Sequence, residues 1–186
     1  NIARVKYLSS AFPDSTILIL FRSPLQQAAS LLKQHQNFQR IHEEDMFAQK
    51  YMQDTGHFDF GKNLRPIDFG DWLSKDKISD PNTLTFWLQY WIYTYRYLID
   101  EKNDRTRFFS YDSLCDNPKR GLENLGRILE LDDCRALKNN VDLIKKADPH
   151  PIDTDAIKST MLDRAQALYL ELQKKENADF NRFIKV

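Results

Sequence analysis

Residues Thr16–Lys33, TILILFRSPLQQAASLLK, carry the pattern that decides the fold. Residues 16–21 form a continuous apolar run with β-branched side chains, which is typical of a strand buried on both faces of a parallel sheet. Ser23 and Pro24 then supply a helix N-cap and a first-turn proline. The apolar side chains that follow have the spacing of a buried helix face: Leu25, Ala28, Ala29 and Leu32. We therefore predict a strand, a tight turn and a helix.

The same order recurs in the second half of the chain. Arg107–Tyr111 reads as a second buried strand, and Asn117 with Pro118 repeats the cap and first-turn proline of a helix. The apolar positions of that helix are Leu122, Leu125 and Leu129. Two strand-to-helix units with helices between them predict an α/β domain with a parallel sheet.

Weaker signals place the remaining elements. Periodic apolar positions predict a helix from about 83 to 100, a short helix near 133–145 and a closing helix from 155 to about 174. Residues 2–8 read as the end of a helix, and 53–81, which holds three of the five glycines, reads as a long loop.

Composition limits the classes of protein to consider. The 186 residues are 41% hydrophobic, so we predict one domain over residues 1–186. Lys plus Arg (27) balances Asp plus Glu (27), so we expect no nucleic-acid partner, and any anion site must be built locally. The two cysteines lack CxxC spacing, and no apolar run approaches the ~20 residues of a membrane span. We expect a cytoplasmic protein without a membrane-spanning segment.

A candidate anion site lies where the first strand meets its helix. Arg22 follows the strand directly, at the sheet edge where open α/β folds place ligands and beside a helix N-terminus. Ser23 and Ser30 lie on one polar helix face together with Gln26 and Gln27. A guanidinium and a hydroxyl suit a phosphate monoester. The alternative from spacing alone is that Arg22 pairs with a carboxylate and Ser30 is solvated.

Phe21–Ser30, FRSPLQQAAS, resembles the motif with which sulfotransferases bind the 3′-phosphate of the donor 3′-phosphoadenosine 5′-phosphosulfate (PAPS). The preceding Phe12–Leu20, FPDSTILIL, is similar to the lead-in of that family. Phe108–Leu131, FFSYDSLCDNPKRGLENLGRILEL, resembles its tyrosine, acidic residue, leucine and Asn/Asp-Pro segment, in the family's order. The likeness is closer to bacterial and carbohydrate-type members than to the aryl and steroid enzymes, whose Arg-Lys-Gly loop has no match.

The resemblance implies a three-layer P-loop-like fold with a central parallel sheet flanked by helices. It implies that Arg22 and Ser30 bind the 3′-phosphate and that Tyr111 lies near the adenine, although a half-buried tyrosine at a strand end is the alternative for Tyr111. PAPS would be the donor and adenosine 3′,5′-bisphosphate (PAP) the product. The acceptor would be a small molecule, lipid or saccharide, and we expect no metal.

Besides the unmatched Arg-Lys-Gly loop, the chain departs from the family at the loop that holds the 5′-phosphosulfate. Sulfotransferases hold the 5′-phosphosulfate with an upstream glycine-bearing loop and a lysine, whereas the first glycine here is Gly56 and no GxxxxGK[ST] occurs. We expect residues 1–186 to be a partial sulfotransferase domain whose N-terminal part is missing. Two alternatives remain: a relative of the P-loop nucleotide kinases, binding ATP with magnesium, and a non-catalytic PAP- or nucleotide-binding module.

The general base has several candidates. His57, in the glycine-flanked GHFDFG of Gly56–Gly61, could take the acceptor proton, and its alternative is a structural or solvent-facing role. His35 and His42 are weaker candidates that could line the acceptor entrance. The aromatic run Phe86–Tyr97 could wall the acceptor pocket or form plain core.

Overall fold

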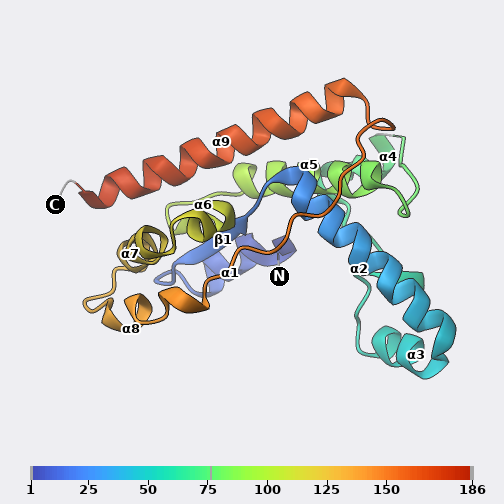
Figure 1. Ribbon diagram of the computed structural model, residues 1–186, viewed down its shortest axis with the longest axis horizontal. Helices are drawn as coiled ribbons and strands as arrows, with labels where there is room; N and C mark the ends of the chain where they lie inside the picture. The colour runs from blue at the N-terminus through green and yellow to red at the C-terminus, as the bar shows by residue number, and fades with distance from the viewer. Residues whose placement is uncertain (1, 76, 185–186) are drawn as a thin grey trace. The chain divides into compact units, whose positions relative to one another are not determined.

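The computed structural model describes residues 2–75 and 77–184, with side chains described through residue 180. Its sheet is a parallel pair, β1 (Ile17–Phe21) and β2 (Thr106–Ser110), in the register Ile17↔Thr106 to Phe21↔Ser110 (Figure 1). The α/β class and the parallel pairing predicted from the sequence are therefore confirmed. Because Phe21 pairs with Ser110, the turns that follow the two strands begin at the same edge of the sheet.

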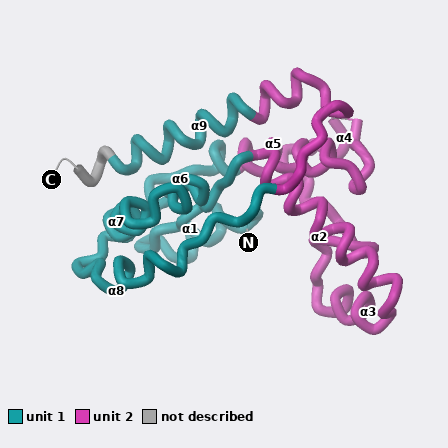
Figure 2. Tube along the Cα trace, viewed as in Figure 1, with its two compact units in different colours: residues 1–23, 98–149, 166–186 teal, residues 24–97, 150–165 magenta. Residues whose placement is uncertain are grey.

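The chain divides into two compact units (Figure 2). Unit 1 comprises residues 1–23, 98–149 and 166–186, and unit 2 comprises residues 24–97 and 150–165. The strands and their turns belong to unit 1. The prediction of one domain stays a prediction.

Unit 1 surrounds the strand pair with helices. Its elements besides the strands are η1 (Ile2–Arg4), α1 (Val5–Ala11), α6 (Tyr111–Asp116), α7 (Pro118–Ile128), α8 (Arg135–Lys138), η4 (Val141–Leu143) and the later part of α9 (Ser159–Ile184). Phe21 and Phe108 pack edge to face across the pair, with ring centroids 6.5 Å apart. Leu20 is 55% exposed, so the expectation that both faces of the first strand are buried is wrong at this residue.

Unit 2 is built on α2 (Pro24–Glu44) and an aromatic core. Its other elements are α3 (Met46–Asp54), η2 (Gly61–Asn63), η3 (Phe69–Asp71), α4 (Trp72–Lys75), α5 (Leu84–Asp100) through Tyr97, and the first turns of α9. Trp72, Phe86, Trp87 and Trp91 are almost completely buried. The burial of Phe86, Trp87 and Trp91 confirms the core interpretation of the aromatic run on α5.

Several element boundaries differ from those predicted. The helix expected near 133–145 is replaced by the four-residue α8 and the 3-10 turn η4. The closing helix begins at Ser159 and extends to Ile184, later at both ends than expected. In the described residues, none of the helices combines the length and the apolar character that crossing a membrane requires.

Candidate functional site

The turns after β1 and β2 bring Arg22 and Tyr111 together. Arg22 directly follows β1, and Tyr111 opens α6 directly after β2. The guanidinium carbon of Arg22 lies 5.3 Å from the centroid of the Tyr111 ring, a cation–π contact. The Arg22 Nε is buried and has no hydrogen-bond partner among the described residues. Within the described part of the chain, Arg22 makes no ion pair with a carboxylate, which is the alternative interpretation.

Asp112 ties the two turns to each other and to α9. Its Oδ2 accepts a hydrogen bond from the Ser23 amide (2.5 Å) and another from the Tyr169 hydroxyl (3.0 Å). Burial, and then the nearby Asp112 charge, raise the pKa of Tyr169, so its hydroxyl stays a donor. The Tyr169 ring also packs edge to face on Phe21, with centroids 5.8 Å apart. One carboxylate thus fixes the turn that carries Arg22.

Removing the Asp112 carboxylate is expected to destabilise unit 1. Asp112→Ala leaves the part-buried Ser23 amide without an acceptor, which should lower the free energy of unfolding by about 2 kcal/mol. Asp112→Asn keeps a side-chain oxygen at the same place and should cost less than about 1 kcal/mol. Urea denaturation of both variants measures the difference, and equal losses would contradict the acceptor role of this side chain.

The side chain of Tyr111 is hydrogen-bonded to the backbone of Lys145. Its hydroxyl donates to the Lys145 carbonyl (3.4 Å), and a hydrogen bond with Cys115, followed by burial, raises the pKa of Tyr111. Lys146 pairs with Asp116 at 2.5 Å. The hydroxyl of Tyr111 is therefore engaged, and its ring supplies the contact with Arg22.

Two glutamines on α2 form hydrogen bonds with other groups of the protein. The Gln27 Oε1 accepts from the Trp91 indole N–H (3.1 Å) and the Tyr95 hydroxyl (3.2 Å). Gln26 accepts from the backbone N–H of His150 (2.8 Å) and donates to its carbonyl (3.2 Å). Ser30 is half-buried on the same helix. Arg22 belongs to unit 1 and Ser30 to unit 2.

The histidines occupy different environments. His57 is exposed on the loop between α3 and η2, where its amide donates to the Met52 carbonyl (2.8 Å). His35 and His42 are buried, with 2% and 1% of their surfaces exposed. The expectation that these two residues line an entrance is wrong.

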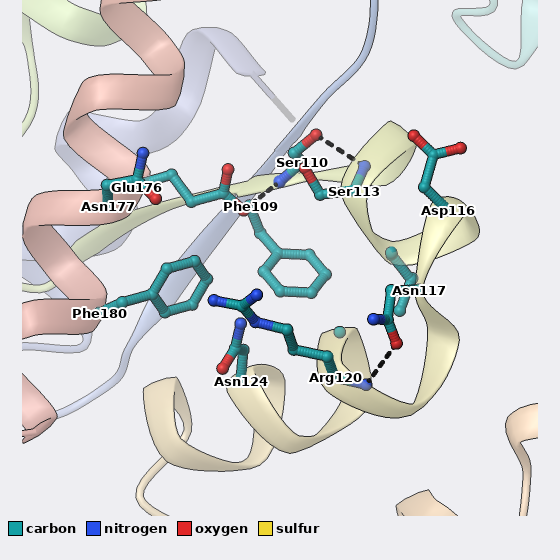
Figure 3. A pocket seen from close by; sticks show the side chains of 12 residues that line it. Phe109, Ser110, Ser113, Asp116, Asn117, Arg120, Asn124, Glu176, Asn177 and Phe180 are labelled. Carbon is teal, nitrogen blue, oxygen red and sulfur yellow. Dashed lines mark hydrogen bonds between the residues drawn. The ribbon is translucent and has the colours of Figure 1, made fainter.

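An open pocket of about 340 Å³ lies beside the end of β2 (Figure 3). Figure 3 shows Glu176 projecting from α9 toward Ser110, while Arg120 and Asn124 enter from α7. The Glu176 carboxyl accepts a hydrogen bond from the Ser110 amide at 2.8 Å. Burial raises the pKa of Glu176 to about 7. This pocket places a carboxyl with a raised pKa, a guanidinium and amides together. Helical periodicity gave no signal for it, because Glu176 reads as an ordinary polar position.

The chain matches no family model, no curated protein and no solved structure in comparisons with each. Residues 2–75 and 77–180, whose side chains are described, also contain no cluster of three or more His, Cys, Asp or Glu side chains able to hold a metal ion. The assignment of function therefore rests on the sequence motifs and on the geometry of the two turns.

Proposed function

We propose that this chain binds the 3′-phosphate and adenine of PAPS and takes part in sulfuryl transfer to an acceptor hydroxyl or amine. The observation that carries the proposal is the Arg22 guanidinium, stacked on Tyr111 at the edge where two parallel strands end. Its buried Nε has no partner within the described residues, which suits a bound anion. The likeness of Phe21–Ser30 and Phe108–Leu131 to the sulfotransferase motifs supports the same conclusion.

Each residue has a distinct part in this proposal. Arg22 donates a pair of charge-assisted hydrogen bonds to the 3′-phosphate, and the Ser30 hydroxyl, eight residues further on, adds a third donor. Tyr111 presents an aromatic face for the adenine. His57, exposed on its loop, is the proposed base that accepts the proton of the acceptor.

The reaction would be an in-line displacement at sulfur. The acceptor oxygen or nitrogen forms the new bond to sulfur, the bond from sulfur to the 5′-phosphate oxygen of PAPS breaks, and PAP leaves. By analogy with phosphoryl transfer, positioning and charge stabilisation do most of the work. We propose that β1 and β2 belong to a larger parallel sheet of the three-layer P-loop-like kind. The acceptor would be a small molecule, lipid or saccharide.

Calorimetric titration with PAP, adenosine 5′-monophosphate (AMP) and ATP tests the proposal. PAP should bind more tightly than AMP, which lacks the 3′-phosphate. Arg22→Ala should weaken PAP binding by roughly 30- to 150-fold, since a hydrogen bond to a charged group contributes about 1.5–3 kcal/mol and Arg22 supplies a bidentate pair. Ser30→Ala should weaken it by about tenfold. Neither substitution should change the weak affinity for AMP.

Arg40→Ala is the matched control. Arg40 lies on α2 with 62% of its side chain exposed and pairs with Glu44, so its loss should leave PAP binding unchanged. Equal PAP affinity in the Arg22 and Arg40 variants would overturn the proposal. Preferential binding of ATP with magnesium would favour the nucleotide-kinase alternative. Tight PAP binding without transfer to any acceptor would favour the non-catalytic alternative.

A further inference from the structure

Two buried histidines on α2 face the 3-10 turn η2. His35 and His42 are seven residues apart, close to two helical turns, so both lie on the same side of α2. Only 2% and 1% of their surfaces are exposed. Both histidines and the turn belong to unit 2.

Each imidazole accepts a hydrogen bond from one of two consecutive backbone amides. The Gly61 N–H donates to His35 Nδ1 at 3.1 Å, and the Lys62 N–H donates to His42 Nδ1 at 3.2 Å. A ring nitrogen accepts a hydrogen bond only when it carries no proton. The geometry therefore requires both side chains to be neutral, with their protons on Nε2.

The Nε2 atoms have no anionic partner that would favour an imidazolium. His42 Nε2 lies 3.2 Å from the Met52 sulfur on α3, and His35 Nε2 has no hydrogen-bond partner among the described residues. Each ring also packs on an aromatic side chain. The ring centroids of His35 and Trp87 of α5 are 5.5 Å apart, and those of His42 and Phe38 are 5.8 Å apart. A proton added to either ring would place a charge in an aromatic cluster and remove the acceptor of a backbone amide.

We propose that His35 and His42 form an acid-sensitive latch, which holds the segment Phe58–Asn63 against α2 while both imidazoles are neutral and releases it when they are protonated. This segment follows directly on His57 in the chain. The latch goes beyond the proposed function, because it depends only on contacts within unit 2 and operates whether or not the chain binds PAP.

Burial and the nearby charged groups together determine how the pKa values of the two histidines change on folding. Burial is the main cause that lowers the pKa of both histidines. The negative charge of Asp80, which precedes α5, raises the pKa of His35 and so partly offsets the effect of burial. The positive charge of Lys62 on η2 lowers the pKa of His42 further. Lys62 also lies 3.8 Å from Glu43, which partly offsets its charge.

Because both pKa values are lowered on folding, the unfolded segment takes up protons first. The latch is fully formed above the unfolded pKa of 6.5 and weakens as the pH falls below that value. Each histidine that stays neutral in the closed state shifts the opening equilibrium by about tenfold at one pH unit below 6.5.

Hydrogen exchange followed by NMR on the whole chain measures the latch directly. Between pH 7.5 and 5.5, the protection factors of the Gly61 and Lys62 amides should fall after correction for intrinsic exchange, by up to about tenfold for each histidine that stays neutral in the closed state. Amides in the middle of α5 serve as an internal reference and should change little. Unchanged protection at Gly61 and Lys62 would overturn the proposal.

Two asparagine substitutions separate titration from hydrogen bonding. In His35→Asn and His42→Asn the side-chain oxygen can occupy the place of Nδ1, but it does not titrate. The double variant should keep protection at pH 7.5 and lose its pH dependence. His57→Asn, at the exposed histidine, should leave the pH dependence of Gly61 and Lys62 protection unchanged, whatever its effect on sulfuryl transfer. A pH dependence that persists in the double variant would contradict the latch.

The unmodified chain supplies a test that does not depend on how the variants fold. Imidazole ¹⁵N shifts at pH 7.5 should report an unprotonated Nδ1 and a protonated Nε2 for both His35 and His42. A proton on Nδ1 of either ring, or an imidazolium at this pH, would overturn the proposal.

Discussion

Replacing Gly61 by alanine is expected to lower the free energy of unfolding by about 4 kcal/mol. Gly61 has a φ of +69°, a left-handed conformation that costs an L-residue roughly 1–2 kcal/mol. An added Cβ would also lie 2.6 Å from His42 Nδ1 and 3.0 Å from the Phe38 Cβ. Such overpacking of a buried site costs typically about 1–3 kcal/mol, so the two penalties add to a large loss.

Gly56→Ala separates these two penalties. Gly56 has a φ of +78°, but an added Cβ there would meet nothing within 4 Å. Its substitution should therefore carry only the conformational cost, roughly 1–2 kcal/mol. Urea denaturation of the two variants gives the contribution of the close approach as their difference. If both variants unfolded at the same urea concentration, the tight packing of Gly61 on α2 would be refuted.

Local signals explain which elements could be predicted from the sequence. The unit β1–α2 combines a continuous apolar strand, a proline at the first helical position and a regular apolar helix face, all within Thr16–Lys33. In α7, Asn117 accepts the Arg120 amide as the predicted N-cap. These features are encoded within a few residues, so no tertiary information is needed to find them.

The absence of the helix predicted near 133–145 has a local cause as well. Asn139 and Asn140 follow α8 directly, and the Asn140 side chain donates to the Ala136 carbonyl at 2.7 Å. Asparagine competes for backbone hydrogen bonds and is a poor residue in helix interiors. Here the side-chain bond accompanies the end of the helix, which the apolar spacing alone did not reveal.

In the candidate site, too, some contacts follow from predicted elements and others do not. That Arg22 and Tyr111 lie near each other follows from two parallel strands ending at one edge, which the sequence does predict. The hydrogen bonds that Tyr169 donates to Asp112 and that Gly61 donates to His35 join residues 57 and 26 positions apart. No periodicity or spacing rule relates such pairs, so the roles of these side chains become visible only in the folded chain.

Glu176→Gln is expected to stabilise the protein by about 3 kcal/mol at pH 8. Glu176 is 5% exposed, and burial, with the charge of Asp179, raises its pKa to about 7 from an ordinary 4.5. The native state therefore binds this proton more tightly than the unfolded state, and stability falls as the pH rises from 4.5 through 7. The difference between a pKa of about 7 and one of 4.5 corresponds to about 3 kcal/mol, because one pH unit is 1.36 kcal/mol. Glutamine avoids this loss and keeps an oxygen that can accept the Ser110 amide.

The pH dependence of this gain distinguishes a titrating carboxyl from a packing effect. The midpoint of thermal unfolding should rise by roughly 6–12 °C at pH 8, and the difference between variant and unmodified chain should nearly vanish at pH 4.5. Glu171→Gln is the matched control, since Glu171 lies on the same helix with 36% of its side chain exposed and pairs with Lys175. A gain at pH 8 that persisted unchanged at pH 4.5 would show that the substitution acts through packing and not through the titration of Glu176. No gain at either pH would mean that the ionised carboxylate is as well solvated beside Ser110 as in the unfolded chain.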